Sequence, residues 1–449
     1  MPGKPEPVQV SFRRAIVLLV VVSLVVSGIA LLNSFGGTRD RSTGEAGCTT
    51  SGNPPQISYD YFNVDTGSVL SAISSGTPVS VPFHGGAHTL QLAAYNLGVP
   101  GAKIIIDDTT QIDPPFSTAI GYQTGDTSSL ALVTVYQNYF DAMLYLPSSG
   151  GWFFDSNIPG SAINGSIHRG WNMTSNPLPT GPYINDMPPS CEGGGGGSGP
   201  STRGSAGPQP LHNPVQQNLL ATADMDYVGL FWWCPFFFGI ADTTCAASAM
   251  ATEVARLNNV YNGLQSRGVN TPMVNFNVAA YDVHTRNANG GMTSFDGFEL
   301  IGQFRTHDVN VHDANLNYHA SHLFTGKELN GNVIGLGGWG GQGPDFQAHW
   351  SMTQQVSAGL STYQATDWGR MIANSQEIGH TYNAHHEFAV HIRLCILFLC
   401  FDFFTIMWPA YMGDASQLSR FSDDVTDNLP PASANSDRVH AEAHVKVQR

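Results

Sequence analysis

Hydrophobic positions in the second half of the chain follow two different spacings. From Ala246 to Leu264, apolar residues recur every three or four positions, which predicts a helix. Residues 273–283, MVNFNVAAYDV, place apolar side chains at alternate positions and predict a half-buried strand. Helical spacing returns at 295–307, FDGFELIGQFRTH, and a short apolar run ending in glycines follows at 331–338, GNVIGLGG. This alternation of strands and helices predicts an α/β layer.

Other apolar and aromatic runs extend this pattern. Residues 226–233, DYVGLFWW, predict a further strand. The runs at 230–240 and 394–408 are too short to cross a membrane and are expected to be buried. Between 128 and 146 the chain carries short β-branched and aromatic runs, which are typical of a β-rich unit. Beyond Phe421 the chain is polar, and the end of the chain is expected to be disordered.

One uncharged run near the N-terminus is of a different kind. Residues 15–32, AIVLLVVVSLVVSGIALL, follow Lys4, Arg13 and Arg14. As a helix this run measures about 27 Å, enough for a bilayer core. The basic flank predicts that the first residues stay inside and that the rest is exported. The run is either an uncleaved anchor or a cleaved signal peptide. We therefore expect either a membrane-anchored protein whose remaining part is extracellular, or a secreted protein.

Composition shifts divide the rest of the chain, most clearly at the glycine-, serine- and proline-rich stretch that begins at Cys191. The predicted organisation is a cytoplasmic N-terminus (1–14), an anchor or signal (15–32), a linker (33–55), a β-rich unit (56–190), a flexible linker (191–213), an α/β unit (214–429) and a polar tail (430–449).

Charge and cysteine content narrow the class of protein. Only 12% of the residues are charged, and the net charge is -15 with no basic patch, which argues against nucleic-acid binding. Six cysteines in an exported chain predict disulfides. Cys234 with Cys245, and Cys395 with Cys400, are close enough in sequence to pair.

The chemistry of the chain is concentrated in residues 374–387, NSQEIGHTYNAHHE. On a helix, Gln376 and His380 lie one turn apart on one face, where two side chains can hold one metal ion. Glu377 is then placed as a general base beside metal-activated water. Asn383 tolerates the left-handed conformation that ends a helix, so that His386 can return as a third ligand.

These positions resemble the metzincin zinc proteases, which carry His-Glu-x-x-His-x-x-Gly-x-x-His followed by a methionine turn. Met407, in TIMWP, matches that turn. Residues 296–307 and 319–338, which include HLFTGKEL, are similar to the helix and edge-strand region of the reprolysin-like (adamalysin-type) branch. The resemblance covers about residues 215–425, and residues 56–190 are more loosely similar to the β-rich propeptide of such proteases.

The resemblance implies a fold, a cofactor and a reaction. The expected fold is a metzincin-like α/β (α+β) domain with a twisted mixed sheet and a long active-site helix, preceded by a β-rich propeptide-like domain and an N-terminal transmembrane helix. The implied cofactor is Zn²⁺, the implied partners are protein or peptide substrates, and the implied reaction is hydrolysis of the peptide bond. A substrate strand would pair with the edge strand at Val333, Ile334, Gly335 and Leu336.

The departure from the family is Gln376, which replaces the first histidine ligand and offers only an amide oxygen. Two readings follow: a weakened zinc endopeptidase, or an inactive pseudoprotease that binds peptides. His385 is an alternative ligand. Cys191 is either a disulfide or surface thiol or a group that caps zinc in a latent form. For the histidine-rich stretch we expect structural or surface roles, with a second metal site as the alternative; its members are His307, His312, His319 and His322.

Overall fold

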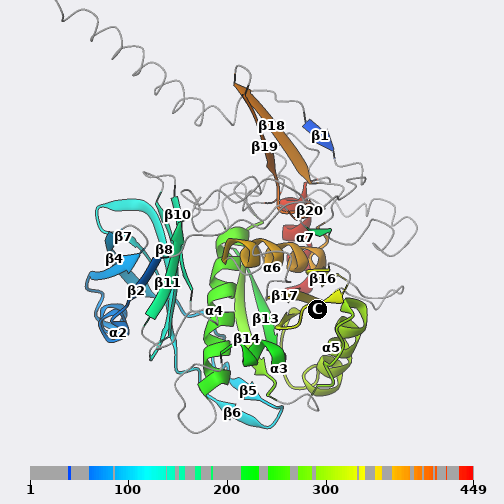
Figure 1. The fold of residues 1–449 in the computed structure, drawn as a ribbon. Helices are drawn as coiled ribbons and strands as arrows, with labels where there is room; N and C mark the ends of the chain where they lie inside the picture. Colours follow the sequence, from blue (N-terminus) through cyan, green and yellow to red (C-terminus); the bar gives the residue numbers. More distant parts are fainter. Residues whose placement is uncertain are drawn as a thin grey trace, which may run out of the picture.

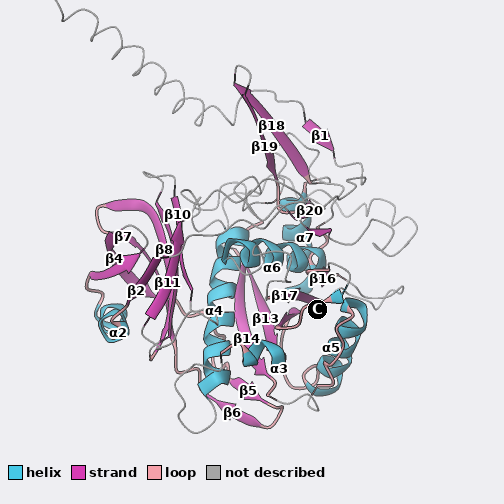
Figure 2. Ribbon diagram, in the orientation of Figure 1, coloured by secondary structure: helices cyan, strands magenta, loops and turns pink. Residues whose placement is uncertain are grey.

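The structure is a computed structural model, and it describes the chain in segments (Figure 2). The described residues are 39–41, 60–83, 86–137, 139–146, 151–156, 167–172, 184–185, 214–231, 241–262, 272–285, 290–330, 333–338, 349–355, 367–384, 389–396, 399–407, 410–411, 421 and 434–447. Side chains are described for most of these residues, but not for the strands at 151–172 and 390–404.

The helices and strands of the described residues have the following bounds. The helices are α2 (Thr66–Ser75), α3 (Met225–Gly229), α4 (Ala241–Asn262), α5 (Gly297–Val311), α6 (Asp367–Thr381) and α7 (Asn435–Val447). The strands are β1 (Arg39–Arg41), β2 (Asp60–Asn63), β3 (Val79–Phe83), β4 (Gly86–Ala94), β5 (Ile104–Ile106), β6 (Thr110–Ile112), β7 (Ser117–Gln123), β8 (Asp126–Tyr136), β9 (Tyr139–Leu146), β10 (Gly151–Ser156), β11 (Ile167–Asn172), β12 (Ile184–Asn185), β13 (Val215–Ala223), β14 (Val274–Val283), β15 (Ala320–Thr325), β16 (Gly335–Gly337), β17 (Trp350–Gln354), β18 (Val390–Ile396), β19 (Leu399–Phe404) and β20 (Ala410–Tyr411).

A seven-stranded mixed sheet forms the centre of the molecule, in the order β16-β17-β15-β13-β14-β5-β6. The strands from β17 to β5 run parallel, and the two outer strands, β16 and β6, are antiparallel to their neighbours. Central parallel strands are buried on both faces, and β15 is accordingly buried at every position. The predicted helices around 246–264 and 295–307 and the predicted strands at 273–283 and 331–338 are confirmed as α4, α5, β14 and β16.

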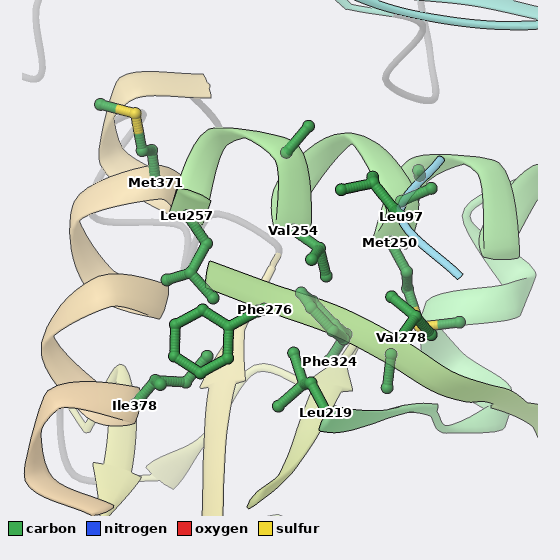
Figure 3. Packing of buried hydrophobic residues seen from close by; sticks show 14 of the residues in the cluster. Leu97, Leu219, Met250, Val254, Leu257, Phe276, Val278, Phe324, Met371 and Ile378 are labelled. Atoms are coloured by element: carbon green, nitrogen blue, oxygen red, sulfur yellow. The ribbon is translucent and has the colours of Figure 1, made fainter. Parts of the chain in front are cut away.

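An eight-stranded antiparallel sheet, in the order β2-β11-β10-β9-β8-β7-β4-β3, lies beside the mixed sheet, and α4 runs between the two (Figure 1). On α4, Met250, Val254 and Leu257 pack against β14 at Phe276 and Val278 (Figure 3). Residues of β8 and β9 belong to the same buried cluster. Because one buried cluster includes residues of α4 and of both sheets, α4 joins the two sheets through a shared core. Burial of each large apolar side chain in this core stabilises the folded state by about 1.5–3 kcal/mol.

The β-rich segment does more than precede the α/β unit. Its strands β5 and β6 extend the mixed sheet, because β5 pairs in parallel with Tyr281–Val283 of β14. Leu97, from the same segment, lies in the shared core (Figure 3). Arg256 of α4 and Asp141 of β9 also form a buried ion pair of 2.6 Å, which connects α4 to the antiparallel sheet. The β-rich segment therefore precedes the α/β unit in sequence and also contributes strands and core residues to it.

The predicted fold class is wrong in its membrane-spanning part. Among the described residues no helix combines the length and the apolar character needed to cross a bilayer. Residues 15–32, on which that prediction was based, lie outside the described residues. The fold that the structure supports is a mixed α/β fold.

Two local predictions also need correction. Residues 226–233 were expected to form a strand, but α3 begins at Met225 because the side chain of Asp224 accepts a hydrogen bond from the Tyr227 N–H and caps the helix. The chain end was expected to be disordered. Instead, α7 buries Val439 and Ala443, and Gln217 donates a hydrogen bond to the Ala443 carbonyl over 2.9 Å.

Candidate functional site

Helix α6 carries the predicted motif, and its end has the predicted conformation. Asn383 has a φ of 66°, in the left-handed region, and the Ala384 N–H returns to the Gly379 carbonyl over 3.0 Å. This is the hydrogen bond of a helix C-terminal cap. Arg438 of α7 donates to both the carbonyl and the side-chain oxygen of Asn383, each over 2.8 Å. The helix therefore stops where the sequence predicted, and α7 fixes the turn.

Glu377 and Gln376 are both buried, with 1% of each residue exposed. Glu377 lies directly against β16. A Cβ atom on Gly335 would come within 2.5 Å of the Glu377 Cγ, and one on Gly337 within 2.0 Å of the Glu377 carbonyl oxygen. Only glycine allows a strand and a helix to approach so closely. The glycines of GNVIGLGG therefore bring the edge of the mixed sheet onto the carboxylate.

His380 is half-buried, one turn beyond Gln376. Its Nδ1 lies 3.0 Å from the Ala384 carbonyl oxygen. A carbonyl can only accept, so Nδ1 carries the hydrogen and the lone pair of the ring is at Nε2. Histidines that bind metal ions are commonly oriented in this way. The helix cap at Ala384 therefore sets the tautomer of His380.

Met407 lies beneath the same turn of α6. It is fully buried, and a Cβ atom on Gly379 would be 3.1 Å from its sulfur. The hairpin of β18 and β19 leads directly into this position. Gln376, Glu377, His380, Met407 and β16 are thus brought together.

Several predicted residues lie outside the described part of the chain: His385 and His386 follow α6 but are not described, and neither are Cys191 and Cys234. Cys245 is disulfide-bonded, as expected for an exported chain, but its partner is not among the described side chains. The backbone of the hairpin places Cys395 opposite Cys400. Their side chains are not described, so the pairing of these two cysteines stays a prediction.

A buried charge network holds α6 against α4. Glu253 of α4 accepts hydrogen bonds from Arg370 over 2.9 Å and from Asn374 over 3.3 Å, both on α6. The same carboxylate accepts from Arg256 over 2.9 Å, and Arg256 continues to Asp141. This network fixes the start of α6 and so the direction in which the motif faces.

Two histidines of the histidine-rich stretch have structural roles. His322 is fully buried beneath α6, with Nδ1 2.7 Å from the Ser351 hydroxyl and Nε2 3.3 Å from the Asn374 side-chain oxygen. Burial lowers its pKa to about 3, so the ring is neutral. The Asn218 N–H donates to Nδ1 of His319 over 2.8 Å. Both belong to hydrogen-bond networks of the sheet.

The other two histidines of that stretch, for which a second metal site was the alternative, lie beside three residues that the sequence analysis did not name. Asp108, Asp282, His284 and His307 each offer one ligand atom, and these atoms lie within 4.8 Å of one another. His312 is next to them, with Nε2 3.1 Å from Oδ2 of Asp282. The missed signal was the pair Asp282 and His284: residues two apart in a strand point to the same side.

Opposing influences set the pKa values in this group. Burial raises the pKa of Asp282, but the charge of His284, its hydrogen bond and the nearby imidazoles of His307 and His312 together outweigh burial and hold the pKa well below its usual range. Burial lowers the pKa of His284, but the charge and hydrogen bond of Asp282, together with the charges of Asp108 and Asp107, outweigh burial and raise the pKa. His312 follows the same pattern. The group therefore favours an ionised Asp282.

Comparison with known proteins gives structural neighbours only. No protein-family model matches the chain, and no curated protein matches it. Metalloproteinase-II from Bacteroides fragilis is similar at 13% identity and a TM-score of 0.40, over 80% of this chain and 91% of that chain. A structure described as a chaperone-substrate complex is similar at 10% identity and a TM-score of 0.32, over 53% of this chain and 35% of that chain. At these TM-scores neither similarity bears on activity.

Proposed function

We propose that the chain is a metal-dependent endopeptidase in which Glu377 is the general base. One observation carries the proposal: the carboxylate of Glu377 is buried directly against β16, an outer strand of the mixed sheet. A peptide that paired with such an edge would lie next to this carboxylate. General bases act from positions of this kind, within reach of the proton that they remove.

The donor atoms at α6 fit a zinc ion that is held less firmly than usual. His380 and His386 would hold it, with Gln376 in the first ligand position. The hydrogen bond from His380 Nδ1 to the Ala384 carbonyl supports this assignment. The amide oxygen of Gln376 is a weak ligand for zinc, which predicts reduced affinity. When bound, zinc lowers the pKa of water and polarises a peptide carbonyl.

The residues of this chain then have distinct tasks. The backbone of Val333, Ile334, Gly335 and Leu336 would hold the substrate as an added strand. Glu377 takes the proton from the attacking water and returns it to the departing amine, as a general base and then a general acid. Met407 packs under Gly379 and keeps the turn that carries His380 in place.

A second function, a peptide-binding pseudoprotease, is favoured by Gln376 alone. The residue is buried on the helix face that would meet the metal, so an imidazole is missing from the position where zinc proteases need one. In that case β16 would still bind an extended peptide, but no peptide bond would be cleaved.

The test compares the full chain with three variants. We expect the parent to cleave a quenched fluorescent peptide library, and a chelator to stop the cleavage. Glu377→Gln should lower kcat by roughly 10²–10⁴-fold, the usual contribution of a general base. Gln376→His should increase zinc affinity by very roughly 10²–10³-fold, about one ligand's share of a complete site. His88→Ala, which removes an imidazole far along the chain, is the matched control.

The outcomes separate the two functions. A parent chain that binds peptides but cuts none, and that gains cleavage with Gln376→His, is a pseudoprotease. Cleavage that persists unchanged in Glu377→Gln would overturn the assignment of the base. Absence of both binding and cleavage in the parent and in Gln376→His would overturn both functions.

A further inference from the structure

A second group of metal-binding side chains lies away from α6. Asp282 is the penultimate residue of β14 and His284 directly follows the strand, His307 lies on α5, and Asp108 lies in the turn between β5 and β6. In Figure 1, β5 and β6 lie at the bottom of the view and α6 lies well above them, near the middle. The group is assembled from three separate segments, and it shares no residue with the proposed peptidase site.

Three distances within the group are close to those between ligand atoms around a bound ion. His284 Nε2 lies 2.9 Å from Asp282 Oδ2, His307 Nε2 lies 3.5 Å from the same oxygen, and His307 Nε2 lies 3.3 Å from Asp108 Oδ1. A tetrahedral ion with bonds of about 2.0–2.1 Å holds neighbouring ligand atoms roughly 3.3 Å apart. These side chains are therefore already close to the separation that such an ion requires.

Polar atoms in the group lack hydrogen-bond partners although they are buried. Asp282 and His284 are no more than 1% exposed. Oδ1 of Asp282, Nδ1 of His284 and Nε2 of His307 have no hydrogen-bond partner among the described residues. Buried polar atoms without partners are costly, and several of them in one small group of side chains point to a bound ion or water.

The surroundings hold the group in place. Asp107 accepts hydrogen bonds from the Thr285 N–H over 2.7 Å and from its hydroxyl, which ties the β5–β6 turn to the end of β14. Gly290 covers the rings: a Cβ there would lie 3.3 Å from both His284 Cε1 and His307 Nδ1. With neutral imidazoles, Asp108 and Asp282 leave two negative charges, which one divalent cation would balance.

We propose that Asp108, Asp282, His284 and His307 bind a structural zinc ion that fastens the β5–β6 turn to the end of β14 and to α5. Zinc accepts both imidazole nitrogen and carboxylate oxygen in four-coordinate sites, whereas calcium and magnesium require oxygen ligands. Burial of Asp282 and His284 favours a closed structural site over an open catalytic one. His312, whose Nε2 lies 3.1 Å from Oδ2 of Asp282, would orient that carboxylate.

The test uses the full chain, stripped of metal and titrated with zinc while the thermal unfolding midpoint is followed. Cobalt(II) serves as a spectroscopic probe, since a closed tetrahedral site gives intense visible absorption. We expect zinc to raise the midpoint. We expect His307→Ala and the milder, partly exposed Asp108→Asn to reduce zinc affinity by at least roughly 10–100-fold. Zinc should also protect the β5–β6 turn from hydrogen exchange.

His380→Ala separates this site from the one on α6. The zinc-dependent rise in midpoint and the protection of the β5–β6 turn should persist in that variant, and His88→Ala should behave like the parent. If His380→Ala removes the zinc effect, or if Asp108→Asn and His307→Ala bind zinc as the parent does, the proposal is wrong. Because these readouts do not depend on cleavage, failure of the peptidase proposal would leave this result intact.

Discussion

Two groups of imidazole and carboxylate side chains in this chain are built in opposite ways. The group on α6 comes from one helix, and its spacing is set by the helical turn. The group around Asp282 comes from three segments, and its spacing is set by β14, α5 and the β5–β6 turn together. The first lies against an edge strand, where we propose chemistry on a peptide. The second is enclosed, where we propose an ion that holds the fold together.

The buried imidazoles of the two regions also differ in the direction in which their pKa is shifted. His322, under α6, contacts only neutral groups, and burial lowers its pKa to about 3. Burial acts on His284 in the same direction, but the charge and hydrogen bond of Asp282, together with the charges of Asp108 and Asp107, outweigh it and raise the pKa. The neutral imidazole of His322 therefore supports α6. The imidazole of His284 is instead suited to carry a charge or to bind a metal ion beside Asp282.

The largest expected effect is that of Asp282→Ala in the metal-free chain. The change removes the carboxylate that three buried imidazoles face. Breaking a buried pair by removing one partner costs about 3–5 kcal/mol, which urea unfolding followed by circular dichroism will measure. Asp113→Ala, which removes the exposed partner of Lys103, should stay within about 0.5 kcal/mol. Equal losses of unfolding free energy in the two variants would show that Asp282 has no special structural role.

The contact between β16 and α6 can be broken without touching a charged group. In Gly337→Ala the added Cβ would lie 2.0 Å from the Glu377 carbonyl oxygen. The strand must move away, at a cost of about 1–3 kcal/mol in unfolding free energy and with loss of peptide binding at the edge.

Gly302→Ala on α5 is the control for that change. Nothing lies within 4 Å of its added Cβ, so the helix should gain about 0.4–1 kcal/mol. A destabilisation of the same size in both variants would show that the close contact at Glu377 has no special role.

Acid should weaken the support beneath α6 in a defined pH window. The folded-state pKa of His322 is lowered from 6.5 to about 3, so the folded chain keeps this ring neutral while the unfolded chain protonates it. The stability that depends on a neutral ring is complete above the unfolded-state pKa and is lost as the pH falls. Between pH 7 and 5 the loss should be about 2 kcal/mol.

His322→Gln is the control, because it keeps a polar side chain that does not titrate. The slope of unfolding free energy against pH between 7 and 5 should be smaller in this variant than in the parent. Parallel slopes would mean that other groups cause the acid sensitivity.

How far the sequence could predict these regions follows from how they are built. The α6 motif and its stop at Asn383 lie within one short stretch, so spacing indicated them, whereas the contact of Gly335 and Gly337 with Glu377 became visible only in the fold. Residue 226 was placed in a strand because the aromatic run favoured one, whereas the cap at Asp224 decides the local structure. The end of the chain was expected to be disordered because its helix is polar overall, and only the contacts of Val439 and Ala443 reveal that it docks.

The Asp282 group could not be predicted in full from local patterns in the sequence. Asp282 and His284 carry a local signal, but nothing near them in sequence points to Asp108, which lies more than a hundred positions earlier. That contact exists because β5 pairs in parallel with β14. Parallel pairing between distant strands has no local signature, so both the shared sheet and the group at its edge became visible only in the fold.

The smallest effect separates the two groups most cleanly. Asn383→Ala places a residue with a poor left-handed preference at a φ of 66° and removes the side-chain oxygen that Arg438 contacts. It should cost about 1 kcal/mol, while Asn383→Gly, which adopts that φ freely, should cost less. Because this turn carries the Ala384 carbonyl that orients His380, Asn383→Ala should weaken zinc binding at α6 and leave zinc-dependent protection of the β5–β6 turn unchanged. A change at both places would show that the two groups are coupled, and the distinction between a local site and an assembled one would fail.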